Sequence, residues 1–289
     1  MLAPSLLQEI ALHLSVSPGS IHVRPQGGGS INNTFRLQSG NLQVFCKINS
    51  ATKFPQLLAQ EAAGLEAIRK TGCFRVPQVL QHFTKAGQQV LLMEWIEEGR
   101  RDDFFWKGFG SALAAMHSLH QPMHGWDVDN YMGAVPQKND RMEDWNAFFH
   151  AMRLAPMVKR CRDAGLLSAG EAGLFNNLYP KLDAIFESCP PSFLHGDLWS
   201  GNFICDTSGT PVLIDPAVYY GHPAMDLGMT TLFGGFHPFF YDAYNEVLPF
   251  PPNHREQWRV ANLYPLLVHL YLFGRSYWNQ VRAIVKDYS

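Results

Sequence analysis

Three side chains in the second half of the chain have the types and the spacing that proton transfer and metal binding require. Asp197 and Asn202 belong to the run His-Gly-Asp-Leu-Trp-Ser-Gly-Asn (195–202), and Asp215 ends the run Leu-Ile-Asp soon afterwards. An aspartate that lies against a hydroxyl group can accept its proton as a general base. Asparagine and aspartate oxygens are ligands of the kind that Mg²⁺ prefers. Either aspartate, taken alone, can also be a turn residue that bonds its own backbone.

A glycine turn near the start of the chain has the composition of an anion-binding loop. Gly27, Gly28, Gly29 and Ser30 lie between two predicted strands. Glycines permit positive φ angles and let backbone N–H groups approach an anion closely. The turn alone is explained more simply as a hairpin connection. It is neither a Walker loop, since no Gly-Lys-Ser/Thr follows, nor a Rossmann fingerprint, since a strand rather than a helix comes next.

Lys47 and Glu61 are candidates for a buried ion pair. Lys47 stands in the apolar run Val-Phe-Cys-Lys-Ile, where it either points to solvent or reaches a phosphate. Glu61 falls three residues after Leu58 and four before Leu65, so it lies within the apolar stripe of a predicted helix. A carboxylate on a buried stripe needs a cationic partner, and Lys47 is the candidate. At the edge of the stripe Glu61 would instead stay solvated.

The order of these residues along the chain is that of the kinases. In kinases an Asp-x-x-x-x-Asn run forms the catalytic loop, and an earlier strand lysine pairs with a helix glutamate to hold the phosphates of ATP. One such motif can arise by chance, but the ordered set is much less easily explained that way: glycine turn, Lys47, Glu61, Asp197, Asn202, Asp215. The set therefore predicts a site for ATP and Mg²⁺.

The elements that must position these residues divide the chain into a β-rich part and a helical part. Helices are expected at 5–14 and 55–70, and strands at 21–25, 33–38, 42–48 and 88–96. After residue 103 come helices at 104–119, 143–163, 169–187, 238–246 and 254–285, interrupted by a β-like stretch at 193–216. The charged, glycine-containing segment 97–103 is the expected hinge. We predict an α+β, two-lobed fold with an ATP-binding lobe over 1–96 and a catalytic and substrate-binding lobe over 97–289.

Composition and charge argue against several classes of protein. With 46% hydrophobic and 17% charged residues, the 289-residue chain can bury a sizeable core. A net charge of −2 gives no basic field for a nucleic-acid backbone. No apolar run approaches the roughly 18–20 residues of a membrane span, and the first residues lack the basic region of a signal peptide. Nucleic acid and membranes are therefore not expected partners.

Cysteine and histidine placement points to neither a disulfide framework nor a metal cluster. The five cysteines are scattered without a Cys-x-x-Cys pair, which predicts a cytoplasmic protein. His117, His120 and His124 lie close together in the sequence. We interpret them as capping or surface residues, because no cysteine or carboxylate completes a tetrahedral metal site.

At these motifs the chain resembles the fructosamine kinase family, a branch of the aminoglycoside phosphotransferase-like kinases. The resemblance is most specific in His-Gly-Asp-Leu-Trp-Ser-Gly-Asn (195–202) and Ile-Asp-Pro-Ala-Val-Tyr-Tyr-Gly (214–221), where His-Gly-Asp replaces the His-Arg-Asp of protein kinases. Further similar runs extend over nearly the full length, among them 45–49, 61–68, 91–96, 129–133, 144–154, 232–236, 240–246 and 263–274.

The resemblance implies a two-lobed kinase-like fold that uses ATP with Mg²⁺ to phosphorylate a sugar hydroxyl, the one at C3, of a ketosamine such as a fructosamine or ribulosamine. It also implies a role in removing sugar adducts from amines or proteins. By this resemblance Asp197 would be the base, Asn202 and Asp215 would hold Mg²⁺, and Lys47, braced by Glu61, would contact the phosphates.

The resemblance also places the rest of the nucleotide and substrate site. Gly28, Gly29 and Ser30 would cover the phosphates. Met93, Glu94 and Ile96 would belong to the adenine site, with the backbone of Glu94 and Ile96 pairing with the base. Trp199 would offer an aromatic face to the sugar or amine, although packing beneath the loop explains it equally well.

Two departures from the family pattern bear on selectivity. The glycine turn reads Gly-Gly-Gly-Ser-Ile-Asn-Asn, without the acidic residue or the cysteine that some relatives carry, so disulfide-linked pairing of subunits through this loop is not expected. Ala224 stands where relatives often have a glutamate, while Asp226 remains and is expected to brace the catalytic loop.

Two other functions share the motif core. An aminoglycoside- or choline-type small-molecule kinase has the same catalytic residues, although the Trp-Ser-Gly-Asn and Tyr-Tyr-Gly runs favour a ketosamine acceptor. A nucleotide-binding module without transfer activity usually lacks the strand lysine or one of the two aspartates, and Lys47, Asp197 and Asp215 are all present here.

Overall fold

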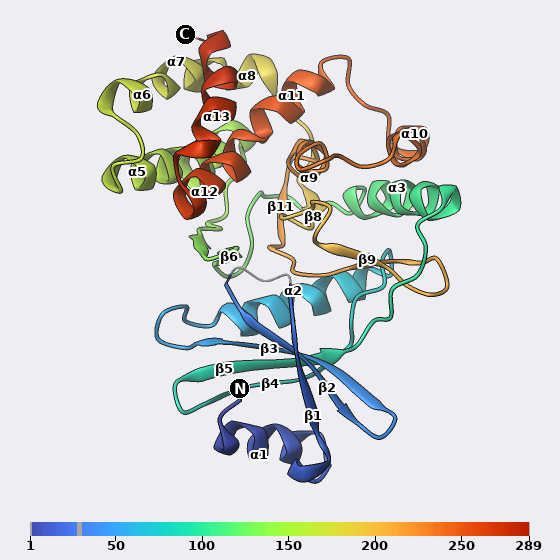
Figure 1. The fold of residues 1–289 in the computed structure, drawn as a ribbon. Coiled ribbons are helices and arrows are strands. Elements are labelled where there is room, and N and C mark those ends of the chain that lie inside the picture. Colours follow the sequence, from blue (N-terminus) through green and yellow to red (C-terminus); the bar gives the residue numbers. More distant parts are fainter. Residues whose placement is uncertain (1, 28–30, 289) are drawn as a thin grey trace. The chain divides into compact units, whose positions relative to one another are not determined.

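The computed structural model describes residues 2–27 and 31–288, so the predicted phosphate-loop residues Gly28, Gly29 and Ser30 lie outside the described residues. The chain forms two compact units (Figure 1). Unit 1 comprises Met1–Arg100 and Ile204–Asp215, and unit 2 comprises Arg101–Phe203 and Pro216–Ser289. The predicted division, 1–96 and 97–289, treats the chain as two consecutive parts, whereas residues Ile204–Asp215 return to unit 1. The first crossing falls within the segment 97–103 that the sequence marks as a hinge.

Unit 1 is built on a five-stranded antiparallel sheet with strand order β1-β2-β3-β5-β4. Its strands are β1 (His22–Gln26), β2 (Asn33–Ser39), β3 (Leu42–Ser50), β4 (Val79–Lys85) and β5 (Gln88–Glu94). The helices α1 (Pro4–His13) and α2 (Leu57–Thr71) lie on opposite faces of this sheet (Figure 1). The short strands β9 (Phe203–Cys205) and β10 (Pro211–Leu213) form a separate hairpin.

The alternation of side chains along β3 explains how one strand serves both faces. Val44, Cys46 and Ile48 are buried in the cluster that packs against α1. Because successive side chains of a strand point to opposite faces, Lys47 is directed to the α2 side, where Glu61 lies. The strand thus carries a hydrophobic face for the core and a single cation for the other side.

Unit 2 is mainly helical around one large hydrophobic core. Its helices are α3 (Asp103–His117), α4 (Trp145–Phe148), α5 (Ala155–Asp163), α6 (Ala169–Gly173), α7 (Phe175–Leu178), α8 (Leu182–Ile185), α9 (Ala224–Met229), α10 (Pro238–Val247), α11 (His254–Ala261), α12 (Leu263–Phe273) and α13 (Trp278–Val285). Two small antiparallel sheets complete it: β6 (Asn130–Met132) with β7 (Val135–Gln137), and β8 (Ser192–Leu194) with β11 (Tyr219–Gly221).

The structure differs from the predicted elements at several places. Strands β6 and β7 were not predicted, and the predicted helix 169–187 is divided into α6, α7 and α8. Strand β4 was not predicted, although Ala86 and Gly87 both have positive φ and join it to β5 through a two-residue turn typical of hairpins. The predicted helix 143–163 contains a π-helical stretch at Phe149–Leu154. The predicted helix 254–285 is divided, and Gly274, with φ of 91°, ends α12 because few other residues adopt that backbone conformation.

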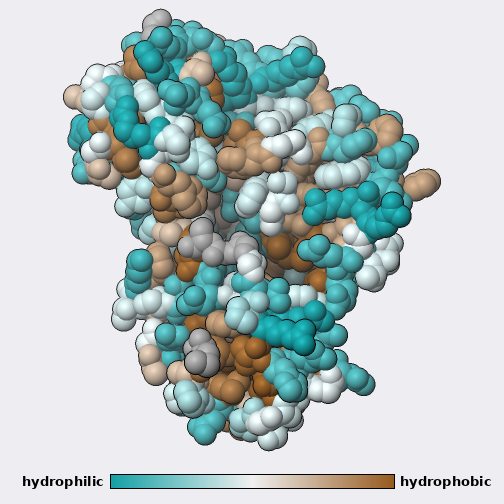
Figure 2. All heavy atoms as spheres, viewed as in Figure 1, coloured by the Kyte–Doolittle hydropathy of each residue, from teal (hydrophilic) through white to brown (hydrophobic). Residues whose placement is uncertain are grey.

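The visible face of the molecule mixes hydrophobic with hydrophilic residues. In Figure 2 the hydrophobic residues form separate groups between hydrophilic ones. Within residues 2–27 and 31–288, no helix combines the length and the hydropathy needed to cross a bilayer.

Candidate functional site

In unit 1 the predicted lysine–glutamate pair is present, and a second carboxylate joins it. The Lys47 ammonium on β3 donates to Glu61 Oε1 on α2 at 2.7 Å and also pairs with the carboxylate of Asp215. Lys47 and Glu61 are buried, whereas the side chain of Asp215 is 40% exposed. The prediction that Glu61 faces a cation rather than solvent is therefore confirmed.

The cluster combines one ammonium group with two carboxyl groups. Burial opposes the charged form of Lys47, but the carboxylates of Asp215 and Glu61 outweigh it and raise the lysine pKa above its ordinary value. Burial raises the pKa of Glu61 to about 7, an effect that the Lys47 ammonium opposes. One ammonium faces two carboxyl groups, so the cluster has an excess negative charge whenever Glu61 is ionised, and that charge favours a cation near the exposed carboxylate, Asp215.

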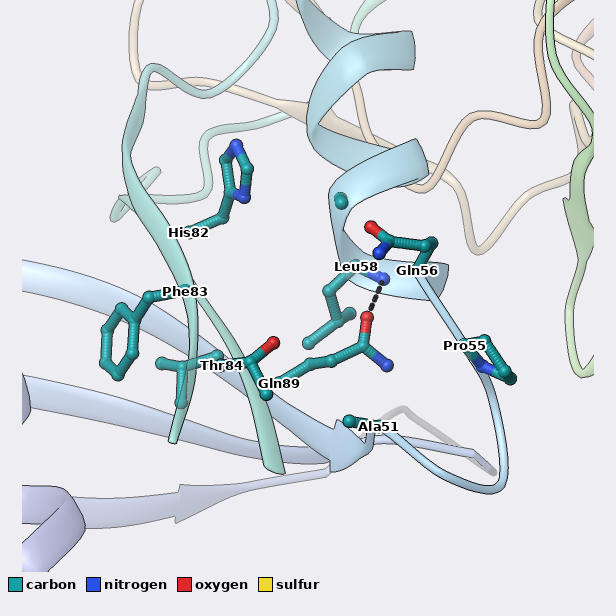
Figure 3. A pocket seen from close by; sticks show the side chains of 10 residues that line it. Ala51, Pro55, Gln56, Leu58, His82, Phe83, Thr84 and Gln89 are labelled. Atoms are coloured by element: carbon teal, nitrogen blue, oxygen red, sulfur yellow. Dashed lines mark hydrogen bonds between the residues drawn. The ribbon is translucent and has the colours of Figure 1, made fainter. Parts of the chain in front are cut away.

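The start of α2 is fixed by a buried amide that sequence reasoning missed. Gln89 on β5 accepts a hydrogen bond from the Leu58 backbone N–H at 3.2 Å (Figure 3). Its Nε2 donates to the Phe54 carbonyl at 2.6 Å. The first turn of a helix has N–H groups without partners inside the helix. Gln89 satisfies one of them and sets where α2 begins, which in turn sets the position of Glu61 about one turn later.

Asp215 reaches the cluster through a segment that belongs to unit 1 although it comes late in the chain. The Leu213 N–H donates to the Arg75 carbonyl at 3.0 Å, and the Arg75 guanidinium pairs with Asp206. Asp215 itself has φ of 55°, in the left-handed region that costs a non-glycine residue free energy. Such strained residues occur where the surrounding structure over-determines them, commonly at functional sites.

The predicted adenine segment lies at the end of β5. Met93 and Ile96 are buried. The Glu94 backbone N–H donates to the Gln78 carbonyl at 2.8 Å, and its carboxylate pairs with Arg75. Pairing of Glu94 with adenine would therefore have to use its carbonyl oxygen, since its N–H group is already engaged.

In unit 2 the structure brings Asp197 and Asn202 together. Asn202 Nδ2 donates to Asp197 Oδ2 at 3.0 Å and to the Asp197 carbonyl at 2.8 Å. Because both bonds use the amide nitrogen, the amide oxygen of Asn202 is turned the other way. Gly196 lies just before Asp197 with φ of 82°, and a Cβ there would stand 2.1 Å from the carbonyl oxygen of Ala217. Only glycine fits this tight approach of two loops.

Asp226 on α9 braces this loop, as predicted. Its two carboxylate oxygens accept the backbone N–H groups of His195, at 2.7 Å, and Gly196, at 2.8 Å. His117 Nε2 lies 3.2 Å from the same carboxylate, and its Nδ1 lies 2.8 Å from the Tyr244 hydroxyl. The loop is therefore held from α9, which is in turn tied to α3 and α10.

The interpretation of the histidines as capping or surface residues is wrong for two of the three. His117 and His124 are buried, and only His120 keeps substantial exposure. Their burial comes from long-range packing, which local spacing in the sequence does not show. Among the described residues no group of three or more histidine, cysteine, aspartate or glutamate side chains is arranged to hold a metal ion.

Trp199 is half-buried beside the catalytic loop. Its ring meets Phe233 edge to face, with centroids 5.7 Å apart, and covers Gly201, where a Cβ would stand 2.4 Å from the ring. The packing interpretation therefore accounts for part of its surface. Contact with a sugar or amine remains a prediction.

A buried polar network in unit 2 was also missed. Arg153, fully buried, donates to Asn139 Oδ1 at 2.8 Å, and Asn139 Nδ2 donates to Asn130 Oδ1 at 3.0 Å. Asn130 Nδ2 in turn donates to the Val218 carbonyl at 2.9 Å, just after Asp215. Asn130 and Arg153 lie in runs that match the family pattern, and this match was the one sequence signal that could have pointed to the network. Their residue types alone do not predict a buried hydrogen-bond network.

The chain was compared with known proteins. A model of the fructosamine kinase family matches residues 6–289. A probable ketoamine kinase of Synechocystis is 36% identical over 99% of this chain and 97% of the relative. A chloroplastic protein-ribulosamine 3-kinase of Oryza sativa is 35% identical over 91% of this chain and 77% of the relative.

Two solved structures have folds similar to that of this chain. The crystal structure of a putative fructosamine-3-kinase from Haemophilus somnus has a TM-score of 0.88 at 26% identity, covering 98% of this chain and 96% of the other. A crystal structure of an aminoglycoside phosphotransferase has a TM-score of 0.64 at 12% identity over 98% and 99%, which supports the fold alone. The predicted α+β, kinase-like fold class is confirmed, and the chain belongs to the fructosamine kinase family.

Proposed function

We propose that the protein transfers the γ-phosphoryl group of ATP to the C3 hydroxyl of a ketosamine, such as a fructosamine or ribulosamine, and so takes part in the removal of glycation adducts. Membership of the fructosamine kinase family makes it an ATP-dependent phosphotransferase. Relatives named ketoamine kinase and protein-ribulosamine 3-kinase support the acceptor class and the C3 position. The observation that carries the proposal is the buried Lys47–Glu61 pair with Asp215 beside it.

Each residue has a defined part in the proposed reaction. Lys47, oriented by Glu61, binds the phosphates of ATP. Asp197 accepts the proton of the C3 hydroxyl while the bond from C3 oxygen to phosphorus forms and the bond from phosphorus to ADP breaks. Asn202 holds Asp197 through its amide nitrogen at 3.0 Å. Trp199 offers its exposed surface to the sugar.

The residues present fit Mg²⁺ as the accompanying cation. Asp215 offers a partly exposed carboxylate in a cluster whose charges favour a cation, and Asn202 offers an amide oxygen. When bound, Mg²⁺ neutralises charge on the phosphate groups. We propose these two residues as its protein ligands, with ATP oxygens supplying others. Gly28, Gly29 and Ser30, and the backbone of Glu94 and Ile96, are proposed to bind the nucleotide.

A cytoplasmic location and the exclusion of nucleic acid and membranes from its partners remain proposals drawn from the sequence. The cysteines Cys46, Cys73, Cys161, Cys189 and Cys205 are free, which is compatible with a reducing compartment.

The experiment that tests the function is a direct competition of acceptors. Purified protein with ATP and Mg²⁺ is offered fructoselysine, ribuloselysine, kanamycin and choline, and ADP release is followed. We expect turnover of a ketosamine, and phosphorus–proton correlation NMR should place the phosphate on C3. A 3-deoxy ketosamine should bind without being phosphorylated. Turnover of kanamycin or choline with none of the ketosamines would replace the proposal by the aminoglycoside- or choline-type alternative.

A further inference from the structure

A cavity of about 400 Å³ lies within unit 2, and none of the residues proposed for phosphoryl transfer lines it. It is lined by Ser192, at the start of β8, and by His222, directly after β11. The catalytic loop instead leaves the opposite end of β8, after Leu194. None of the residues proposed to bind ATP, Mg²⁺ or the ketosamine lines the cavity. Its volume lies within the usual range for small-molecule sites.

The walls favour a flat, uncharged ligand. The Phe250 ring stacks on Tyr244 with centroids 5.3 Å apart and meets Trp258 edge to face at 5.0 Å. Phe250 also stacks on His254, with centroids 5.0 Å apart, so the ring of a ligand would join an existing aromatic cluster. The lining contains no lysine or arginine, and Glu187 is its one carboxylate. An anion would find no lysine or arginine to pair with, and a cation would find one carboxylate, Glu187.

His222 supplies one directed polar contact. The residue is 5% exposed, and its Nδ1 accepts the Ala224 backbone N–H at 3.1 Å. Burial lowers the pKa of His222 to about 3, so the ring is neutral and its proton is on Nε2. Its ring packs against Phe186 on one side, with centroids 5.2 Å apart, and His222 also lines the cavity, where within the described residues Nε2 makes no hydrogen bond. It is a donor that a ligand can satisfy.

A chain of hydrogen bonds connects the cavity wall to the catalytic loop. The Tyr244 hydroxyl contacts His117 Nδ1 at 2.8 Å, and His117 Nε2 contacts Asp226 at 3.2 Å. Asp226 holds the backbone N–H groups of His195 and Gly196. A ligand that packs on Phe250 and Tyr244 binds the arrangement in which this chain is complete, and so favours it.

We propose that this cavity binds a neutral aromatic small molecule carrying one hydrogen-bond acceptor, and that the bound molecule stabilises the catalytic loop through Tyr244, His117 and Asp226. This cavity shares no lining residue with those proposed to bind ATP or the ketosamine, and its lining includes Ala224, which departs from the family pattern. The inference concerns binding and loop stability, so it can fail while the proposed kinase activity stands, and the reverse.

The first test measures binding with prodan, a neutral naphthalene with one ketone oxygen whose emission shifts to the blue in apolar surroundings. We expect saturable binding of one molecule that neither ATP nor fructoselysine displaces. Leu248→Trp fills the cavity from a half-buried position and should abolish binding. His222→Asn keeps an acceptor for the Ala224 N–H but removes Nε2, and should weaken binding about three- to tenfold, the contribution of one hydrogen bond.

The matched control for binding is Phe104→Ser, which removes a residue that is 83% exposed and outside the cavity. It should leave prodan binding unchanged. Three outcomes would overturn the proposed site. They are binding of prodan to Leu248→Trp, failure of prodan to bind to Phe104→Ser, and displacement of prodan by ATP or fructoselysine. Melting temperatures of the variants show that each is folded.

The second test measures hydrogen exchange of the His195 and Gly196 amides with and without prodan. Exchange should slow on binding, because the ligand favours the state in which Asp226 holds both amides. Tyr244→Phe keeps the ring but breaks the contact with His117, so prodan should still bind without slowing exchange. Unchanged exchange in the wild-type protein, or equal slowing in Tyr244→Phe, would overturn the connection to the loop.

Discussion

At the scale of single residues, the Asp197 carboxylate is the proposed general base. Asp197→Asn preserves the shape and the contact with Asn202, at 3.0 Å in the wild-type protein, but cannot accept a proton as a carboxylate does. General-base catalysis contributes about 10²- to 10⁴-fold, so kcat should fall by that order with little change in the KM for ATP. Steady-state kinetics with fructoselysine measure this.

The control for this variant is Asp242→Asn, the same chemical change at an exposed position on α10. It should leave kcat unchanged. If Asp197→Asn retained more than about a tenth of wild-type kcat, another group would have to be the base.

The structure adds Asp215 to the predicted pair of Lys47 and Glu61. Because its ammonium contacts both Glu61 and Asp215, Glu61→Ala leaves the lysine one partner. Lys47→Met should therefore lower kcat/KM for ATP more than Glu61→Ala does. In the double variant the losses should be non-additive, with a coupling of about 0.5–3 kcal/mol. Fully additive losses would mean that Glu61 does not act through Lys47.

At the scale of elements, the tight approach of the catalytic loop to the segment after Asp215 makes Gly196 indispensable. Gly196 and Gly209 have nearly the same φ, 82° and 80°. An added Cβ meets the Ala217 carbonyl oxygen at 2.1 Å in the first case and nothing within 4 Å in the second. Gly209→Ala should cost only the backbone strain, about 1–2 kcal/mol.

Gly196→Ala should cost more than its control and should also lower kcat, because the loop that carries Asp197 has to shift. Urea unfolding and kcat of the two variants provide the comparison. Equal losses of stability, with kcat intact in both, would show that the approach to Ala217 is not needed.

The sequence predicted an element correctly where the pattern that indicates it is local in the sequence. The strand with Lys47 and the helix with Glu61 each carry a periodic apolar pattern, and their pairing followed from the stripe on which Glu61 lies. Strand β4 alternates weakly and was missed, although the Ala-Gly turn after it is a hairpin signal. Burial of His117 depends on Tyr244, more than a hundred residues away in the sequence. Burial of Arg153 depends on a network of asparagine amides.

At the scale of the whole molecule, two buried histidines make stability depend on pH. Burial lowers the pKa of His124 to about 4 and that of His222 to about 3. Between about pH 6.5 and 4 the unfolded chain binds protons that the folded chain does not. Stability should therefore fall as the pH falls, by up to about 1.4 kcal/mol per pH unit for each histidine. Glu61, whose pKa is raised to about 7, acts in the opposite sense.

The variant His222→Asn separates these contributions, because it removes one histidine and leaves His124 and Glu61 in place. Free energies of unfolding from urea titrations at pH 6.5, 5.5 and 4.5 should fall less steeply for the variant than for the wild-type protein. Parallel curves would mean that His222 is not held neutral by its surroundings.

The return of Ile204–Asp215 to unit 1 sets an order of events during synthesis on the ribosome. The N-terminal part of the unit ends at Arg100, but its last segment is translated only after residues Arg101–Phe203. At about 5–20 residues per second, the 115 residues from Arg100 to Asp215 take roughly 6–23 s. During that interval the nascent chain carries Lys47 and Glu61 without Asp215. Unit 1, which begins at the N-terminal end of the chain, is therefore completed only after more than a hundred residues of unit 2 have been made.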